Sequence, residues 1–508
     1  MTRVAVAATS SIAADCARQV AAAGGNAVDA AIAAALMSMN TEPGVCSFAG
    51  GAYVTVWAPG RPPVTVDGIH AVPGLGLDPN LLGRGAVSVD LDYGGGMTTI
   101  VGSGSVAVPG ALAAFEKAWQ RYGNVRWPAL FEPSIDVVRS GFPLSASCHY
   151  YLGYCGALIY GRSDEGYRAL HDENGEVLPA GSTIRVPNLA DSLAMIAKQG
   201  AGVFYEGELA HAMSDHVRRG DGALTLEDLS RYEAIERPAL TADVGNWRIA
   251  TNPPPAVGGA ILTAMLLACA NIDGRSWKQR SLATLIRAHR ACLDFRRDRL
   301  DLADDVGAES AQLIAAAGDG KLLGGWASSS TIHTSAVDDE GLGCAITASA
   351  GYGSGEMPVG TGLWLNNGLG EVELNRRGVD ALAPGSRMPS NMAPCVARAD
   401  KAVLAIGTPG ADRITTAVHQ VIVNALQMDM PLAEAVAHPR LHVDLRGAYD
   451  RIAAEPGLDL PDLDLPVELF DSLNMYFGGV CAAKHDRDSG FDVAADPRRE
   501  SGTCIAGD

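Results

Sequence analysis

The sequence is short of positive charge. Its 508 residues include 39 Lys and Arg against 58 Asp and Glu, which gives a formal net charge of −19 at pH 7. Proteins that bind nucleic acids need clustered Lys and Arg to neutralise phosphates, so we expect no nucleic-acid partner. The acidic excess is typical of a protein kept soluble by its charge. With 47% apolar and 19% charged residues, the chain can still bury a substantial core.

Cysteine patterns that bind metals or build disulfide frameworks are also missing. The ten cysteines form no CxxC pair and no Cys/His grouping at metal-ligand spacing. Their pattern argues against a zinc site and against a secreted disulfide scaffold. We expect buried, reduced thiols, with no metal and no cofactor.

No segment has the length or composition of a membrane or targeting signal. The N-terminal residues carry one Arg, and Asp15 interrupts them before any apolar run of signal-peptide length. The longest apolar stretch, residues 256–271, is too short to cross a bilayer comfortably and contains two glycines. It predicts a core helix, and we expect a cytoplasmic protein with no membrane partner.

Helix caps and hydrophobic patterns predict mainly helices, with one hairpin, over the first 300 residues. Ser11 is a candidate cap for a helix over residues 11–23, and Asn26 for an Ala-rich buried helix over 27–39. Short β-branched runs at 52–57 and 63–67 predict a hairpin. Residues 110–300 are mostly helical in pattern, with a capping box that begins at Thr225.

The pattern changes after a Gly- and Ala-rich stretch at 308–325, which we interpret as a weakly ordered or exposed connector. Residues 331–337 and 344–349 predict a second hairpin. Further strands are expected at 362–365 and 402–406, and a helix at 413–426. This order of elements favours an α+β layered fold.

Three segments could carry chemistry. Residues 328–335 are rich in hydroxyls, residues 407–413 form a tight loop that leads into a helix, and residues 352–355 form a Gly-rich turn. Each alone has an ordinary reading, since hydroxyl runs are usually solvated strand faces and the loop could be a plain connection. Backbone N–H groups at a helix start nevertheless suit a developing negative charge. The turn lacks the Gly-Lys-Ser/Thr of a nucleotide loop.

Taken together, the segments resemble the γ-glutamyltranspeptidase family of N-terminal nucleophile (Ntn) hydrolases over nearly the whole chain, including its relatives in actinobacterial alkylproline antibiotic pathways. The matching motifs occur in the family's order: 24–31 (GGNAVDAA), 105–110 (SVAVPG), 224–232 (LTLEDLSRY), 253–259, 365–367 (LNN) and 495–498 (ADPR). The resemblance implies a four-layer αββα sandwich whose two subunits come from one self-cleaved precursor.

The resemblance also implies where the chain breaks and what the break makes. The peptide bond between Ser330 and Thr331 would be cut, which gives a large subunit, 1–330, and a small catalytic subunit, 331–508, in one globular unit. A threonine hydroxyl is a poor nucleophile until a base takes its proton, and a free α-amine with a pKa near 8 is such a base. Ser349 matches a second hydroxyl that hydrogen-bonds the nucleophile. Gly410 and Ala411 match a diglycine oxyanion hole.

The residues that should bind the substrate depart from the family. Its Asp-x-Arg-Glu segment, whose arginine grips the substrate α-carboxylate, reads Asp67-Gly-Ile69-His70. An asparagine, a glutamine and an amine-binding aspartate fall at Gly351, Gly368 and Glu371, and a paired serine motif reads Ser390-Asn391. The carboxylate clamp is therefore largely lost, which disfavours glutathione as a substrate.

These observations favour a self-processing threonine hydrolase with a rebuilt pocket. It would cleave an amide or C–C bond of a small non-γ-glutamyl intermediate in specialised or antibiotic metabolism. The alternatives are a genuine γ-glutamyl hydrolase or transferase and an unprocessed, inactive binding or scaffold relative. The expected partners are a small-molecule substrate and the two subunits, which could form a homo-oligomer of heterodimers.

Overall fold

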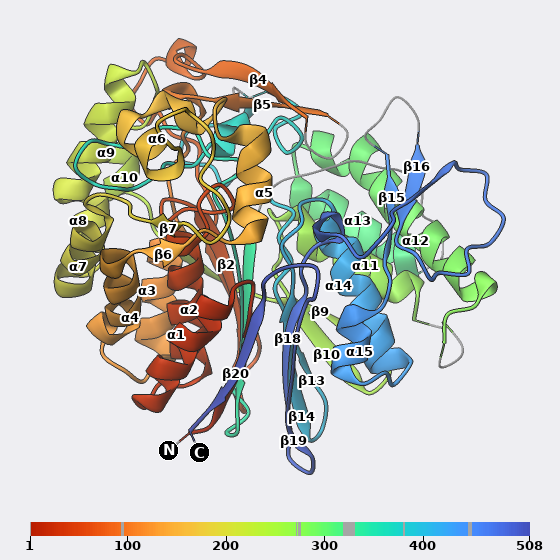
Figure 1. Cartoon of the computed structure of the whole chain (residues 1–508). Helices are drawn as coiled ribbons and strands as arrows, with labels where there is room; N and C mark the ends of the chain where they lie inside the picture. The colour runs from red at the N-terminus through yellow and green to blue at the C-terminus, as the bar shows by residue number, and fades with distance from the viewer. Residues whose placement is uncertain are drawn as a thin grey trace.

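Two β-sheets lie face to face between two layers of helices in the computed structural model (Figure 1). The structure describes residues 2–92, 96–270, 272, 276–318, 331–378, 381–445 and 450–507. Strands β11 and β12 of one sheet pack against β14 of the other. The two chain ends lie side by side because β1 pairs with β20.

The first sheet has seven strands in the order β20-β1-β11-β12-β2-β3-β8, and every neighbouring pair is antiparallel. Its centre is the expected hairpin of β11 and β12. The strands are β1 (Val4–Ala8), β2 (Gly51–Trp57), β3 (Val64–Gly68), β8 (Ile235–Pro238), β11 (Ile332–Asp338), β12 (Gly343–Ser349) and β20 (Gly502–Ala506).

The second sheet is also antiparallel, with six strands in the order β19-β18-β14-β13-β10-β9. Its strands are β9 (Leu240–Val244), β10 (Trp247–Thr251), β13 (Cys395–Arg398), β14 (Ala402–Gly407), β18 (Cys481–Asp486) and β19 (Gly490–Ala495). Short strands outside the main sheets are β4 (Val87–Leu91), β5 (Met97–Val101), β6 (Phe142–Pro143), β7 (Thr183–Ile184), β15 (Leu441–Asp444), β16 (Arg451–Ala454) and β17 (Val467–Leu469).

Helices cover the outer face of each sheet (Figure 1). On the side of the first sheet lie α1 (Ser11–Ala22), α2 (Ala27–Thr41), α3 (Ala111–Tyr122), α4 (Trp127–Ser140), α5 (Ala146–Cys155), α6 (Asp164–Leu170), α7 (Leu189–Gln199), α8 (Gly202–Tyr205), α9 (Glu208–Arg219) and α10 (Leu226–Ser230). On the side of the second lie α11 (Val257–Ala268), α12 (Gln279–Asp298), α13 (Val306–Gly318), α14 (Arg413–Ile422) and α15 (Leu432–Ala437).

The buried helix expected after Asn26 is confirmed. Every residue of α2 is buried, because the helix lies between the first sheet and α1 and α4. Asn26 caps it, and Asp29 completes a capping box. The cap of α1 was misplaced by one residue, since the Ser10 hydroxyl, not that of Ser11, accepts the hydrogen bond from the Ala13 N–H.

Two other expectations were wrong. Residues 308–318 of the expected connector belong to helix α13, which packs on α11 and buries Leu313 and Ala317, while 319–325 lie outside the described residues. Residues 362–365 form no strand. Gly362 has a φ of +68°, and Leu365 makes only an isolated bridge to Ala49.

The apolar stretch near residue 260 forms α11, which is buried among other helices, and no helix of the described ranges is long and apolar enough to cross a bilayer. Nine of the ten cysteines are buried.

Small side chains fill the space between the two sheets, which lets the two sheets approach closely. They include Ala5, Ala250, Ala345, Ala405 and Ala483.

Candidate active site

Thr331 immediately precedes β11 and is buried, at 1% exposed. Ile332 pairs with Ala348 in the β11–β12 ladder, so one step further Thr331 lies opposite Ser349. Side chains alternate along a strand, and Val337 of β11 belongs to the core between the sheets. Thr331 therefore faces the second sheet, as Ser349 does, and both line one small cavity.

His333 fixes the start of β11 from between the sheets. Its Nδ1 lies 2.8 Å from Thr347 Oγ1 and its Nε2 2.9 Å from Ser335 Oγ. Burial lowers the pKa of His333 to about 3, so the ring is neutral at working pH. A Cβ at Gly407 of β14 would lie 2.3 Å from the His333 ring, so only glycine allows the sheets to meet here.

The cavity brings together most of the residues that the sequence nominated. It is narrow, because the space that the centre of a water molecule can occupy is only about 10 Å³. Its lining combines hydroxyl, amide, imidazole and carboxyl groups with apolar side chains: Ile69, His70, Thr331, Ser349, Glu371, Leu374, Pro389, Ser390, Asn391, Met392 and Ile414. Ser330 lies outside the described residues.

Gly351 and Gly368, two of the residues expected to bind the substrate, do not line the cavity but lie next to residues that do. A Cβ on Gly351 would come within 3.2 Å of the Glu371 carboxyl carbon, and one on Gly368 within 3.2 Å of the His70 ring. The Gly351 N–H donates to Ser349 Oγ at 3.1 Å. Gly351 and Gly368 thus make room for neighbouring side chains and offer none of their own.

The loop before α14 has the geometry of an anion site. Gly410 and Ala411 have φ values of +129° and +68°, and in the described part of the chain their N–H groups donate no hydrogen bond to the backbone. Ile414, in the first turn of α14, lines the cavity beside Thr331. N–H groups at a helix N-terminus, together with the helix dipole, stabilise a negative charge.

The side chains of Asp412 and Arg413 stabilise this loop through hydrogen bonds. Arg413 Nη1 donates to Asp412 Oδ1 at 2.6 Å, and His442 Nε2 lies 3.1 Å from Asp412 Oδ2. Arg413 Nε also donates to the Tyr476 carbonyl at 3.0 Å, and its guanidinium lies 4.5 Å from the centre of that ring. No pattern in the sequence indicated this cluster.

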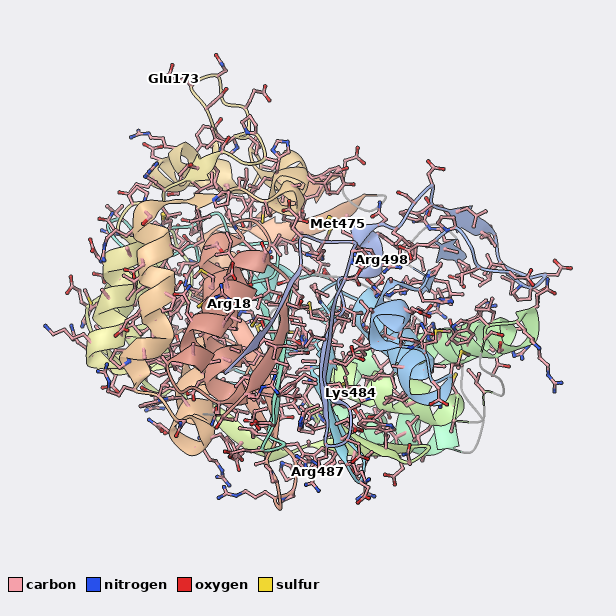
Figure 2. The ribbon with its side chains drawn as sticks, turned by 60° about the horizontal axis from the view of Figure 1, so that its bottom comes forward. Arg18, Glu173, Met475, Lys484, Arg487 and Arg498 are labelled. Atoms are coloured by element: carbon pink, nitrogen blue, oxygen red, sulfur yellow. The ribbon has the colours of Figure 1, made fainter. Side chains whose placement is uncertain are left out.

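A buried ionic network supports the turn that packs on the loop. Arg440 donates to the Phe477 carbonyl and to Asp496, while Arg498 pairs with Asp496 and Glu455. Burial opposes the charged form of Asp496, but Arg440 and Arg498 hold its pKa below the usual value. Glu455 Oε1 accepts from both Arg498 Nε and the Asn474 N–H, which joins the network to the start of this turn; Figure 2 labels Arg498 and Met475.

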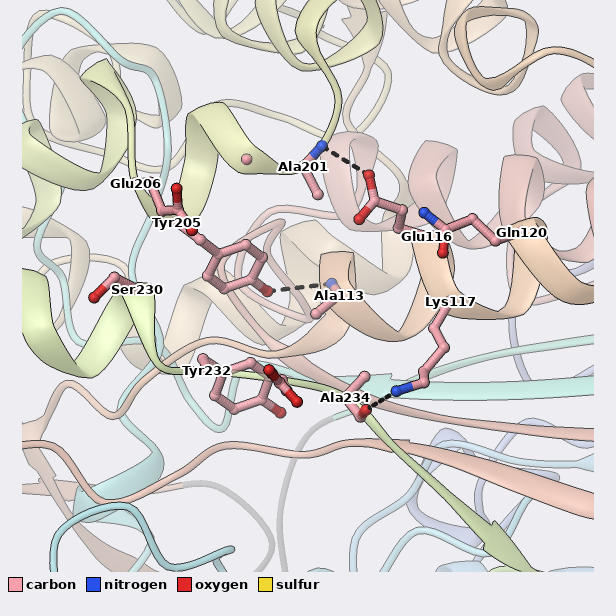
Figure 3. Close-up of a pocket in the computed structure, with 12 residues that line it drawn as sticks. Ala113, Glu116, Lys117, Gln120, Ala201, Tyr205, Glu206, Ser230, Tyr232 and Ala234 are labelled. Atoms are coloured by element: carbon pink, nitrogen blue, oxygen red, sulfur yellow. Dashed lines mark hydrogen bonds between the residues drawn. The ribbon is translucent and has the colours of Figure 1, made fainter.

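The opposite wall of the cavity is fixed through backbone contacts. The Tyr232 hydroxyl donates to the Ile69 carbonyl at 2.5 Å, and the Ile69 N–H donates to the buried Asp67 carboxylate at 3.1 Å. The ring of Tyr232 stacks on Tyr205 at 5.8 Å. A second, outer cleft lies behind these rings (Figure 3), where Lys117 donates to the Ala234 carbonyl and Glu116 accepts from the Ala201 N–H.

The cavity is neutral to acidic. Burial lowers the pKa of His70 to about 4, so its ring is uncharged. Burial and the nearby Glu371 raise the pKa of Glu373, which accepts a hydrogen bond from the Tyr352 hydroxyl at 2.8 Å. Of the residues that the structure describes, no Lys or Arg lines the cavity, and none group as three potential metal ligands.

The family model of γ-glutamyltranspeptidase matches residues 13–506. The chain belongs to the γ-glutamyltranspeptidase family. It is 28% identical over 533 residues to the glutathione hydrolase proenzyme of Pseudomonas aeruginosa, covering 97% of this chain and 93% of the relative. It is 27% identical over 455 residues to the Escherichia coli glutathione hydrolase proenzyme, covering 82% of this chain and 77% of that one.

Solved structures agree on the fold of this γ-glutamyltranspeptidase family member. The cephalosporin acylase from Bacillus halodurans superposes with a TM-score of 0.81 at 20% identity and covers 100% of this chain and 96% of its own. The Helicobacter pylori γ-glutamyltranspeptidase gives 0.52 at 22% identity, over 61% and 88% of the two chains. The expected αββα fold of an Ntn hydrolase is confirmed, and the chain is an enzyme of this family.

Proposed function

We propose that the chain breaks before Thr331 and that the freed threonine attacks the acyl carbon of a small substrate. The observation that carries this proposal is the position of Thr331. It immediately precedes the central strand β11, is buried opposite Ser349, and lines a cavity to which Ile414 in the first turn of α14 also contributes. A buried strand start with a hydroxyl neighbour and a nearby anion site is what an N-terminal nucleophile needs.

The sheet order suits a protein that stays whole after the break. Residues before 330 supply β1, β2, β3 and β8 of the first sheet, and residues after it supply β11, β12 and β20. Strand β1 of the large part lies between β20 and β11 of the small part, and β2 pairs with β12, so cutting the chain at 330 leaves these hydrogen-bond ladders intact. The large part, 1–330, and the small part, 331–508, would therefore remain one unit.

The chemistry follows from the groups around Thr331. Its new α-amine, with a pKa near 8, takes the proton of its own hydroxyl while the oxygen attacks the substrate carbonyl. Ser349 hydrogen-bonds the nucleophile, and the N–H groups of Gly410 and Ala411 stabilise the oxyanion. Collapse of this intermediate releases the leaving group, which takes the proton from the amine. Water then hydrolyses the acyl-enzyme, with the same amine as its base.

The substrate is proposed to be a small acyl compound without a free α-carboxylate. Ile69 stands where the family's arginine would be, and the described lining of the cavity offers no cation in its place. The same groups could hydrolyse an amide or, when the departing carbon can be protonated, a C–C bond. A protein with this fold is named a cephalosporin acylase, which supports a role in specialised or antibiotic metabolism.

A genuine γ-glutamyl hydrolase or transferase is the second candidate, because the relatives in sequence are named glutathione hydrolases. Glu371 keeps a carboxylate where that family binds the substrate amine. Release of p-nitroaniline from γ-glutamyl-p-nitroanilide separates the two candidates. We expect slow release, whereas rapid, saturable release would favour the second.

The deciding experiment compares the purified protein with Thr331→Ala on a denaturing gel. We expect two bands for the unmodified chain, the smaller beginning at Thr331, and one band with no turnover for Thr331→Ala. Thr331→Ser is the matched control and should process and turn over more slowly. A single full-length band from the unmodified, active protein would disprove the mechanism. A single band without activity would favour a scaffold role.

A further inference from the structure

The cavity beside Thr331 contains buried polar atoms that have no hydrogen-bond partner in the described part of the chain. Asn391 is 3% exposed, and neither its side-chain oxygen nor its nitrogen has a hydrogen-bond partner among the described residues. His70 is 2% exposed, and within the same described residues its Nε2 also has no partner. Both side chains line the cavity. Leaving such groups unpaired costs about 1–3 kcal/mol each, so they need a reason to be there.

The chain on either side of Asn391 is, in contrast, held by hydrogen bonds. The Ser390 carbonyl accepts from the N–H groups of Val257 and Gly258 at the start of α11, and Ser390 Oγ accepts from the Met392 N–H at 3.2 Å. The Asn391 side chain is thus presented on a rigid support. A rigid amide with free donors and a free acceptor is suited to a ligand that offers both on one edge.

The cations nearest this cavity are committed elsewhere. Arg376 donates to the Arg297 carbonyl at 2.9 Å, and Arg377 donates to Asp304 at 2.5 Å. Arg387 donates to the Glu233 carbonyl, and its guanidinium lies 4.2 Å from the centre of the Tyr232 ring. The neutral His70 ring supplies no charge either. Among the residues that the structure describes, an anionic group on the acyl part would therefore meet Glu371 and no compensating cation.

We infer that Asn391 and His70 recognise an uncharged amide-type group, with a carbonyl and an N–H on one edge, on the acyl part of the substrate. The amide of Asn391 pairs with it at two points, and His70 Nε2 provides a third contact. Ile69, Leu374 and Met392 supply apolar walls for the carbon chain. This inference rests on the proposed function for the place of the acyl carbon, next to Thr331, and it adds the class of group that the pocket selects.

Isoglutamine and glutamate form a matched pair of probes. Both have a γ-carboxylate and an α-amine, and they differ only in an α-carboxamide in place of an α-carboxylate. Calorimetric titration of the purified protein should show isoglutamine binding at least about 10-fold more tightly than glutamate. Equal or tighter binding of glutamate, or no binding of isoglutamine at 10 mM, would overturn the inference.

Asn391→Leu separates recognition from a structural role. Leu has nearly the same shape and no polar atoms, so it should raise the Tm of the ligand-free protein by about 1–3 °C and abolish the preference for isoglutamine. A lowered Tm for Asn391→Leu would show that the Asn391 amide is paired within the protein, which contradicts the inference.

Neither readout requires a broken chain or turnover. A missing preference in a protein that shows two bands and a Thr331-dependent activity would refute only the amide recognition. A clear preference in a protein that stays one band would refute only the threonine mechanism.

Discussion

His442 Nε2 lies 3.1 Å from Asp412 Oδ2, and the other nitrogen of the same ring lies 3.0 Å from Thr416 Oγ1. All three side chains are buried. His442 belongs to β15, whereas Asp412 follows Ala411 and immediately precedes α14. The contact therefore joins the small sheet to the loop whose N–H groups would face the oxyanion.

His442→Phe should lower kcat about 10- to 100-fold with little change in KM. The oxyanion donors act in the transition state, and loss of one donor costs about 3–4 kcal/mol, so a misaligned loop should lose part of that. Steady-state kinetics on any substrate that turns over provide the measurement. His442→Gln, which can still donate to Asp412, should recover much of the loss.

His419→Gln is the matched control for this prediction. His419 is also buried and sits on α14, but its Nδ1 lies 2.8 Å from His289 Nε2, away from the loop. Its replacement should reduce stability and leave kcat within about threefold. Equal losses of kcat in both variants would mean that α14 is merely destabilised.

Ala411→Gly should leave activity within about threefold and stabilise the protein slightly. The φ of +68° at Ala411 costs an L-residue about 1–2 kcal/mol, and glycine removes that cost while adding some entropy to the unfolded chain. A net gain of about 0.5–1 kcal/mol is expected from urea unfolding. Since the proposed donor is a backbone N–H, a large loss of kcat would argue against the oxyanion role.

Features with a local signature could be predicted from the sequence. The capped helix after Asn26, the hairpin that Thr331 begins and the loop before Arg413 follow from caps, alternation and glycine. Seven of the residues that line the cavity had been nominated by family resemblance, whereas Leu374, Pro389, Met392 and Ile414 had not. Their roles remain predictions, as does the break at Ser330.

Contacts between distant residues had no such signature. Tyr232 is 163 positions from Ile69, and His442 is 30 positions from Asp412. A buried tyrosine or histidine in a helix or strand pattern looks like any core residue until the chain is folded. The prediction of a connector at 308–325 was wrong for a related reason. Helix α13 is held by packing on α11, and its small side chains give little periodic signal in the sequence.

Tyr232→Phe should raise KM about fivefold with kcat nearly unchanged. The lost hydroxyl leaves the Ile69 carbonyl unpaired in a buried wall, and that wall holds the acyl group and not the reacting atoms. Tyr205→Phe is its matched control, because that hydroxyl donates to the Pro109 carbonyl at 3.2 Å and does not touch Ile69. Tyr205→Phe should cost similar stability and leave KM unchanged.

Acidic pH should lower the free energy of unfolding, because buried histidines are neutral in the folded protein and take up protons when it unfolds. Burial lowers the pKa of His70 from 6.5 to about 4, so the unfolded chain takes up a proton below pH 6.5 that the folded chain refuses until pH 4. Stability from this group is complete above pH 6.5 and is lost as the pH falls towards 4. Between pH 7 and pH 5 the loss should be about 2 kcal/mol.

The test compares His70→Gln with the parent in a Thr331→Ala background, which we expect to keep the chain continuous. The free energy of unfolding, measured in urea at pH 7 and pH 5, should fall about 2 kcal/mol less in His70→Gln than in the parent. His211→Gln changes an exposed histidine and should keep the parent's full loss. If His70→Gln shows that same loss, the imidazole is free to take up its proton in the folded protein. The inference that His70 is neutral in the folded protein, on which the recognition of an uncharged group depends, would then be wrong.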